Sequence, residues 1–172
     1  FKYEGSEDTI FNNLDLNIKK DEHTIILGEN GSGKSTLIGI LAGIYRGDKG
    51  TVNQFNKRFG YVGPIPLLFE DTLRNNLLYG IDEDVEDKEI VSKLNDFNVF
   101  EINNEEVLNN IVSSKTLSSG QMQKISYIRA LLNKPETLFL DEATANLDKD
   151  SVFYFDKEIN KFDGTIINVT HK

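Results

Sequence analysis

Apolar residues along this 172-residue chain follow two patterns, short continuous runs and positions three or four residues apart. Short runs bounded by turn residues are typical of buried strands, whereas the wider spacing predicts amphipathic helices. Strands are predicted at residues 24–27, 51–52, 59–63, 138–140 and 165–169, with a turn at 47–50. Helices are predicted at residues 37–44, 72–79, 90–97, 104–111, 118–132 and 148–162. This alternation indicates an α/β protein with a mostly parallel sheet.

The first residues predict an antiparallel pair of strands. Phe1 and Tyr3 alternate with polar neighbours, residues 5–8 have turn composition, and apolar positions resume at 10–18. The ring of Tyr3 could stack on a nucleotide base, but an aromatic residue at a strand edge is more often structural. On spacing alone we favour the structural interpretation of Tyr3.

Residues 28–36 read Gly-Glu-Asn-Gly-Ser-Gly-Lys-Ser-Thr and fit the spacing G-x-x-x-x-G-K-[ST]. In this motif glycines let backbone N–H groups close around phosphate oxygens, the lysine reaches the β- and γ-phosphates, and the hydroxyl binds Mg²⁺. The strand before the motif and the helix after it would aim the positive end of that helix at the anion. A chance match within a Gly/Ser-rich turn is the alternative, and the flanking pattern argues against it. The stretch predicts a nucleotide-binding site.

Two carboxylates and a histidine follow the ends of predicted strands. Asp141 and Glu142 come directly after the run at 138–140, and His171 follows the run at 165–169. The carboxyl ends of parallel strands are where such folds place metal and water chemistry. A lone histidine is usually structural or simply exposed, and the position of His171 leaves both that interpretation and a functional one open.

The composition excludes several classes of protein. The chain has no cysteine and two histidines, which rules out disulfides and thiolate zinc sites and argues against a histidine metal site. A formal net charge of −9 without clusters of Lys and Arg argues against nucleic acid as a partner. No apolar run approaches the roughly 20 residues of a membrane helix, so we expect a soluble domain. Because the first residue is Phe1 rather than methionine, we also expect the chain to be a piece of a longer polypeptide.

Four motifs occur in order: residues 28–35, Leu117-Ser-Ser-Gly-Gln121, Leu138-Phe-Leu-Asp-Glu142 followed by Ala145-Asn-Leu-Asp148, and Val169-Thr-His171. Together they resemble the nucleotide-binding domain of ABC transporters. The second motif is one substitution from the family signature Leu-Ser-Gly-Gly-Gln, and the resemblance extends from Tyr3 to His171. It implies a single domain, 1–172, with a P-loop NTPase core, a mostly parallel sheet, an N-terminal antiparallel β subdomain and a small α-helical signature subdomain at about residues 66–133.

The resemblance implies ATP and Mg²⁺ as cofactors and suggests roles for individual residues. Lys34 would contact the β- and γ-phosphates, Ser35 would ligate Mg²⁺, and Asp141 would hold the metal through water. Glu142 matches the general base that polarises the attacking water. His171 matches the switch histidine that senses the γ-phosphate.

The resemblance also reverses the interpretation of Tyr3, which falls where such domains place the aromatic residue that stacks on adenine. The other nucleotide contacts that it implies in the glycine loop are Gly28, Asn30, Gly31, Ser32, Gly33 and Thr36.

Ser118, Ser119, Gly120 and Gln121 begin a long predicted helix, and Ser118 and Gln121 have the spacing of a capping box. In the family this segment caps the γ-phosphate of ATP held by a second copy, and Asp148 closes the loop that links the two sites. One chain would therefore carry two half-sites of a dimer.

Residues 60–62 and 68–77 resemble the corresponding stretch of exporters. The implied partners are a second nucleotide-binding domain, identical or different, and a transmembrane domain on the same polypeptide. The implied function is ATP hydrolysis that powers export, at the cytoplasmic face of the cell membrane.

The sequence departs from the family pattern in three places. Pro64 stands where a glutamine usually contacts Mg²⁺ and the membrane domain, residues 111–116 lack the acidic-glycine segment of exporters, and the chain ends one residue after His171.

Two other functions therefore stay open. One is a DNA-repair or chromosome-maintenance ATPase head, although no sustained heptads lie between Thr36 and Leu117. The other is a regulatory module that binds ATP with little turnover.

Overall fold

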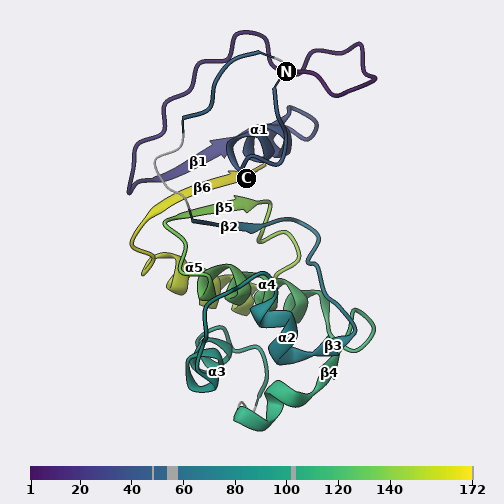
Figure 1. Ribbon diagram of the computed structural model, residues 1–172, viewed down its shortest axis with the longest axis vertical. Coiled ribbons are helices and arrows are strands. Elements are labelled where there is room, and N and C mark those ends of the chain that lie inside the picture. Colours follow the sequence, from purple (N-terminus) through teal and green to yellow (C-terminus); the bar gives the residue numbers. More distant parts are fainter. Residues whose placement is uncertain (48, 54–57, 102–103, 172) are drawn as a thin grey trace.

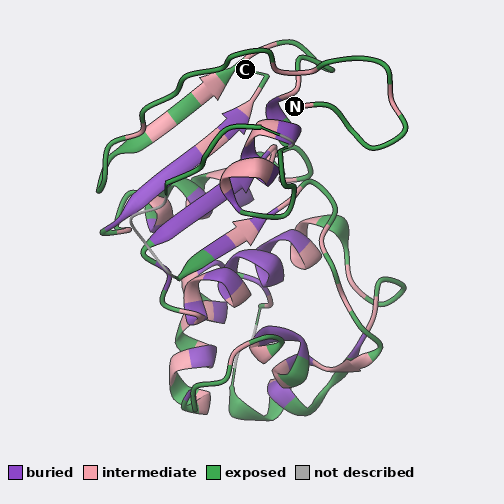
Figure 2. Cartoon of the chain, turned by 45° about the horizontal axis from the view of Figure 1, so that its top comes forward, coloured by how far each residue is buried: buried purple, intermediate pink, exposed green. Residues whose placement is uncertain are grey.

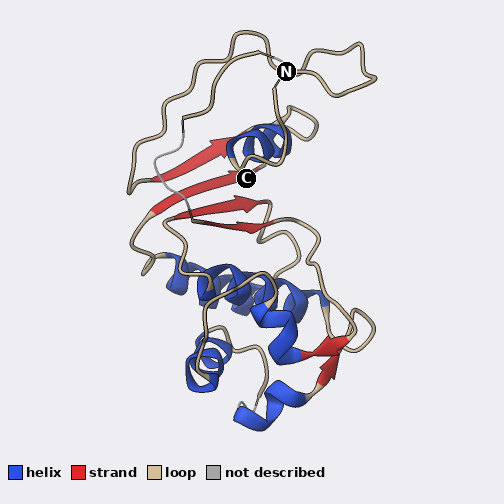
Figure 3. Ribbon diagram, viewed as in Figure 1, coloured by secondary structure: helices blue, strands red, loops and turns tan. Residues whose placement is uncertain are grey.

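The computed structural model describes residues 1–47, 49–53, 58–101 and 104–171, so part of the predicted turn at 47–50 lies outside the described residues. A sheet of four parallel strands forms the centre of the molecule (Figures 1 and 3). Its strands occur in the order β1 (His23–Leu27), β6 (Thr165–Thr170), β5 (Thr137–Asp141) and β2 (Phe59–Val62). The predicted α/β fold with a mostly parallel sheet is confirmed.

Helices cover both faces of this sheet (Figure 1). On one face α1 (Lys34–Leu41) packs Ile38 against Phe139 and neighbouring residues of β6. On the other face α4 (Ser119–Leu132) and α5 (Lys149–Ile159) pack against Leu138 and Leu140. Successive residues of β5 therefore serve opposite cores, as the alternation of side chains along a strand requires. Figure 2 shows the inner strands as mostly buried.

A second group of elements packs around α4, between β2 and β5 in the chain. These elements are β3 (Asp71–Thr72), α2 (Leu73–Leu78), α3 (Asp87–Asp96), the 3₁₀ helix η1 (Glu105–Asn109) and β4 (Ile111–Val112). The predicted inward face of α3 is confirmed, because Ile90, Leu94 and Phe97 are fully buried. The predicted helix at 104–111 is a shorter 3₁₀ helix, and the limits of the helical subdomain, 66–133, stay a prediction.

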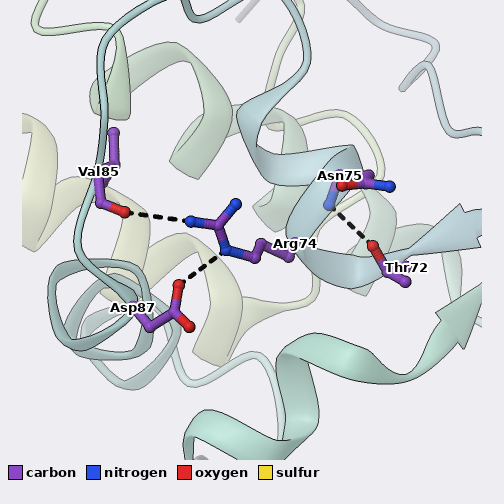
Figure 4. Close-up of polar contacts among 5 residues, drawn as sticks. All are labelled: Thr72, Arg74, Asn75, Val85 and Asp87. Atoms are coloured by element: carbon purple, nitrogen blue, oxygen red, sulfur yellow. Dashed lines mark hydrogen bonds and ion pairs between the residues drawn. The ribbon is translucent and has the colours of Figure 1, made fainter.

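Polar contacts fix the start of α2 and the loop that follows it (Figure 4). The Thr72 side chain accepts a hydrogen bond from the backbone N–H of Asn75 at 3.1 Å, which caps the helix. Arg74 donates from Nε to Asp87 Oδ1 at 2.8 Å and from Nη2 to the Val85 carbonyl at 3.5 Å. Arg74 thus ties the loop between α2 and α3 to α2.

The predicted N-terminal antiparallel pair is wrong. Residues 1–22 contain turns and bends but no strand, although Phe1 bonds through its carbonyl to the N–H groups of Ile10 and Phe11 at 2.9 and 3.2 Å. An isolated two-stranded hairpin is marginal in water unless its apolar face packs on something. Leu14 and Leu16 of this stretch are exposed, so these two residues provide no apolar face for a hairpin. Within the described residues the antiparallel pairing is that of β3 with β4, in the helical region.

Two further strand predictions need correction. Residues 51–53 form no strand, and Val52 is exposed. β1 exists but is an edge strand rather than a buried one, with Ile25 and Leu27 63% and 65% exposed. An apolar run of four residues does not reveal whether a strand has one neighbour or two.

Candidate nucleotide-binding site

The glycine loop connects β1 to α1 and has the backbone shape that phosphate binding needs. Gly31 and Gly33 adopt positive φ angles of 80° and 89°, which suit glycine. Gly33 precedes α1 without a side-chain cap, so the first N–H groups of the helix remain available to a ligand. A Cβ on Gly33 would lie 2.8 Å from Cγ2 of Ile10 and 3.1 Å from Cζ of Phe11. Glycine is therefore required here by conformation and by contact.

The side chain of Lys34 bends back over this loop. Its Nζ donates hydrogen bonds to the carbonyls of Gly28 and Glu29 at 2.8 and 2.7 Å. Lys34 is buried, whereas Asn30 and Ser32 of the same loop are exposed. Among the described residues these neutral carbonyls are the hydrogen-bond partners of the ammonium, and phosphate oxygens could replace them.

Ser35 and Asp141 meet where the first turn of α1 reaches the end of β5. Ser35 Oγ donates to Asp141 Oδ1 at 2.9 Å, and Tyr61 Oη donates to Asp141 Oδ2 at 3.1 Å. Asp141 is only 2% exposed. Burial raises the pKa of Tyr61 above its ordinary value, and the nearby charge of Asp141 adds to the shift.

The oxygen atoms of Ser35 and Asp141 are suitable ligands for Mg²⁺. The hydroxyl of Ser35 and the carboxylate of Asp141 are hard oxygen ligands, and Mg²⁺ usually keeps several waters and binds through one or two carboxylates and phosphates. In the described part of the chain, no cluster of three or more His, Cys, Asp or Glu side chains could hold a metal by itself. Mg²⁺ would therefore depend on nucleotide phosphates as well as on Ser35 and Asp141.

Glu142 and His171 come together beyond the ends of β5 and β6. Asp141 is paired with Val169, and the N–H of Glu142 donates to the Val169 carbonyl at 3.0 Å. Glu142 has a φ of 48°, an uncommon backbone angle for a residue with a side chain. Its Oε1 lies 3.8 Å from Nδ1 of His171. The structure thus brings the two residues together, while their catalytic roles stay predictions.

Tyr3 lies beside the first turn of α1. Its hydroxyl is 2.7 Å from Oγ1 of Thr36, and its ring meets those of Phe1 and Tyr45 edge-on at centroid distances of 5.1 and 5.4 Å. The pKa of Tyr45 is raised, chiefly by the neighbouring Tyr3. Tyr3 is therefore next to the glycine loop, and stacking on adenine stays a prediction.

The signature residues lie at the start of α4. Ser118 and Gln121 exchange hydrogen bonds of 3.2 and 3.0 Å between side chain and backbone, which confirms the capping box. Gln121 also donates to the Val99 carbonyl at 3.3 Å, while Ser118 and Ser119 are exposed. None of these contacts reaches the glycine loop of the same chain.

Asp148 caps α5. Its Oδ1 accepts a hydrogen bond from the N–H of Ser151 at 2.7 Å, and this bond lowers the pKa of Asp148. The cap gives Asp148 a structural reason to be present, and its link to a second site stays a prediction.

Sequence reasoning missed two side chains near the site. Tyr61 contacts Asp141 as described above, and Asn146 donates from Nδ2 to the Pro64 carbonyl at 2.9 Å. The Asn146 bond joins the loop after β5 to the segment where the family glutamine is missing. The alternation of side chains along β2 and β5 could have placed Tyr61 on the same face as Asp141, once the register of the two strands was known.

Comparison with known proteins identifies the family. The ABC transporter family model matches residues 11–145. ATP-dependent permease MDL1 of Candida albicans is 35% identical over 187 aligned residues, which cover 96% of this chain and 27% of that protein. ATP-binding cassette sub-family B member 5 of Homo sapiens is 36% identical over 158 residues, covering 83% of this chain and 12% of that protein. Lactococcin-A transport/processing ATP-binding protein LcnC of Lactococcus lactis subsp. lactis is 32% identical over 181 residues, covering 95% of this chain and 25% of that protein.

The chain therefore belongs to the ABC transporter family. It corresponds to the ATP-binding domain of the exporter-like members, and it spans 12% to 27% of the length of these three relatives. None of the helices in the described ranges combines the length and the apolar character of a membrane span.

Proposed function

We propose that the chain hydrolyses ATP as one half of a dimer that encloses two ATP molecules, and that this reaction powers export across a membrane. The observation that supports this most is the meeting of Lys34, Ser35, Asp141, Glu142 and His171 around one loop and the adjoining strand ends. These are the residue types that phosphoryl transfer to water requires.

Binding would begin at the glycine loop. Phosphate oxygens would take over the ammonium of Lys34 from the carbonyls of Gly28 and Glu29, and would accept from the open N–H groups at the start of α1. Mg²⁺, when bound, would neutralise charge on the β- and γ-phosphates, with Ser35 and Asp141 as its protein ligands. Tyr3, next to Thr36, would stack on the base.

Hydrolysis would depend on Glu142. Its carboxylate, held at the end of β5, would orient the attacking water and accept its proton. His171 would keep this carboxylate in place, because the two side chains are 3.8 Å apart. His171 would also sense the γ-phosphate.

The dimer is proposed because the signature is exposed at the N-terminus of α4 and contacts nothing in the glycine loop of its own chain. The N–H of Gln121 is bound to the Ser118 side chain, and the positive end of the helix dipole still favours an anion here. Ser118 to Gln121 would therefore cap ATP held by a second nucleotide-binding domain.

An exposed apolar patch supports a membrane-domain partner. Ile65 is 85% exposed, and Leu67 and Tyr79 beside it are also exposed. The three residues line a cavity of about 370 Å³ next to Gly63. Exposed apolar patches of this kind mark interaction sites. We propose that the transmembrane domain docks here, which would place the chain at the cytoplasmic face of the cell membrane.

Pro64 is the main reason to consider a regulatory module instead. Proline removes the side-chain ligand, yet the backbone here is held by Asn146 at the Pro64 carbonyl and by Gln123 at the Gly63 carbonyl, 2.9 and 3.0 Å away. These two bonds would hold the backbone of residues 63–64 in place although the glutamine is absent. Nothing comparable favours a DNA-repair head, because the described helices between Thr36 and Leu117 are at most ten residues long.

A phosphate-release assay tests the proposal. The protein with ATP and Mg²⁺ should release phosphate continuously, EDTA should stop the reaction, and the Lys34→Ala variant should show only background. Tight ATP binding without release above the Lys34→Ala background would identify the regulatory module. Release that depends on added duplex DNA would favour the DNA-repair alternative.

A further inference from the structure

Tyr61 reaches the carboxylate of Asp141 from the neighbouring strand. β2 and β5 are parallel, with Tyr61 opposite Phe139 and Val62 opposite Leu140. Side chains at Tyr61, Phe139 and Asp141 therefore share one face of the sheet, and the length of a tyrosine carries its hydroxyl forward to Asp141. Tyr61 Oη donates to Asp141 Oδ2 at 3.1 Å.

The two oxygens of Asp141 have different donors. Ser35, on α1, donates to Oδ1 at 2.9 Å, and Tyr61, on β2, donates to Oδ2. A hydrogen bond to each oxygen restricts the rotation of a carboxylate about its Cβ–Cγ bond, which is otherwise soft. Because Asp141 is 2% exposed, bulk water cannot replace either donor at low cost.

The ring of Tyr61 is itself held in place. A Cβ on Gly63 would lie 3.1 Å from Cε1 of Tyr61, so the backbone at Gly63 packs closely against the ring. Gly63 in turn accepts a hydrogen bond from Gln123 at 3.0 Å. The following residue, Pro64, has no polar side chain, so Tyr61 is the polar group with which this segment reaches Asp141.

We propose that Tyr61 is a positioning residue for the metal site: its hydroxyl holds Oδ2 of Asp141 so that Oδ1 faces Ser35 and the Mg²⁺ that accompanies ATP. This inference rests on the proposed function. The hydroxyl of Tyr61 would then support the metal site in a segment where Pro64 replaces the glutamine that usually contacts Mg²⁺. In this arrangement the phenol acts on the metal site through Asp141.

The Tyr61→Phe variant removes the hydroxyl and keeps the ring. ATP affinity is measured by calorimetric titration in Mg²⁺ and again in EDTA, and the ratio of the two affinities gives the gain due to the metal. We expect unchanged affinity in EDTA and a metal gain reduced by about ten-fold, which is the lower end of the effect of losing one hydrogen bond to a charged group. Tyr154→Phe is the matched control, because Tyr154 lies on α5 with its ring against Phe153 and Lys124.

A double-mutant cycle with Asp141→Asn identifies the route of the effect. If Tyr61 acts through Asp141, Tyr61→Phe should not lower the metal gain further in the Asp141→Asn background. An additive loss would overturn the proposal, and so would equal losses of affinity in Mg²⁺ and EDTA, which would show a general structural role. An unchanged metal gain in Tyr61→Phe would overturn it while leaving the proposed function intact. Absence of any metal gain in the parent protein would contradict the proposed function itself.

Discussion

Nδ1 of His171 lies 3.8 Å from Oε1 of Glu142, across the ends of two adjacent parallel strands. The two side chains are close because of the strand register: Asp141 is paired with Val169, Glu142 follows Asp141, and His171 lies two residues after Val169. The φ of 48° at Glu142 turns the chain out of the strand at this point. Backbone angles of this kind cost about 1–3 kcal/mol and persist where the surroundings enforce them. Here the bond from Glu142 N–H to the Val169 carbonyl is one such constraint.

Replacing His171 should slow turnover more than it weakens binding. His171→Ala removes the side chain that faces the Glu142 carboxylate, so we expect kcat for ATP hydrolysis to fall by about 100-fold, within the usual range for a positioned acid–base group. KM should change much less. His23→Ala is the control, because His23 is exposed at the start of β1. Equal effects of the two substitutions, or a normal kcat in His171→Ala, would contradict the assignment.

Gly33 should tolerate alanine far less than Gly5 does. Both glycines have positive φ, 89° and 80°, so both variants carry the strain of a left-handed residue, about 1 kcal/mol. Only Gly33 also faces neighbours, since its Cβ would lie 2.8 Å from Ile10, while nothing lies within 4 Å at Gly5. Overpacking adds about 1–3 kcal/mol.

Denaturant unfolding of Gly33→Ala and Gly5→Ala measures this difference in free energy of unfolding. ATP affinity should also fall in Gly33→Ala alone. Equal destabilisation of the two variants would mean that the N-terminal segment does not pack against the glycine loop.

The stability contributed by Asp148 should depend on pH. The hydrogen bond from Ser151 lowers the pKa of Asp148, so folding favours the charged carboxylate. The contribution is fully present above the ordinary Asp pKa of about 4 and is lost as pH falls through the lowered pKa of the folded protein. The melting temperature of Asp148→Ala should therefore be below that of the parent at pH 7, with a gap that narrows in acid.

Asp148→Asn is the control for this experiment, because asparagine caps a helix without a charge. At pH 7 its melting temperature should lie between those of Asp148→Ala and the parent, and its difference from Asp148→Ala should not change with pH. A gap between Asp148→Ala and the parent that is the same at pH 7 and pH 3 would show that the cap owes nothing to charge.

Local sequence patterns correctly predicted two kinds of element. One kind is held by contacts between residues close in sequence, and the other is buried on both faces. Residues 138–140 lie in β5, where every position is buried, and the capping box of Ser118 and Gln121 starts α4 within one residue of its predicted place. The glycine loop was recognisable because its function requires residue types at fixed spacing. Lys34, Ser35 and Asp141 accordingly lie where that spacing indicates.

The failures concern relationships between distant segments. Residues 10–18 alternate like a strand but form none in the part of the chain that the structure describes, and β1 is apolar yet lies at the edge of the sheet. The bond from Tyr61 to Asp141 joins residues 80 positions apart. Such contacts depend on strand order and register, which no local pattern contains.

The central claim, a dimer that encloses ATP, is tested most directly with the Glu142→Gln variant. Glutamine keeps the shape of the side chain but cannot accept the proton from water, so ATP should bind without being consumed. Light scattering coupled to gel filtration should show a dimer in saturating ATP and Mg²⁺, and a monomer in EDTA or when Lys34→Ala is added. A monomer that is saturated with ATP and Mg²⁺ would contradict the claim.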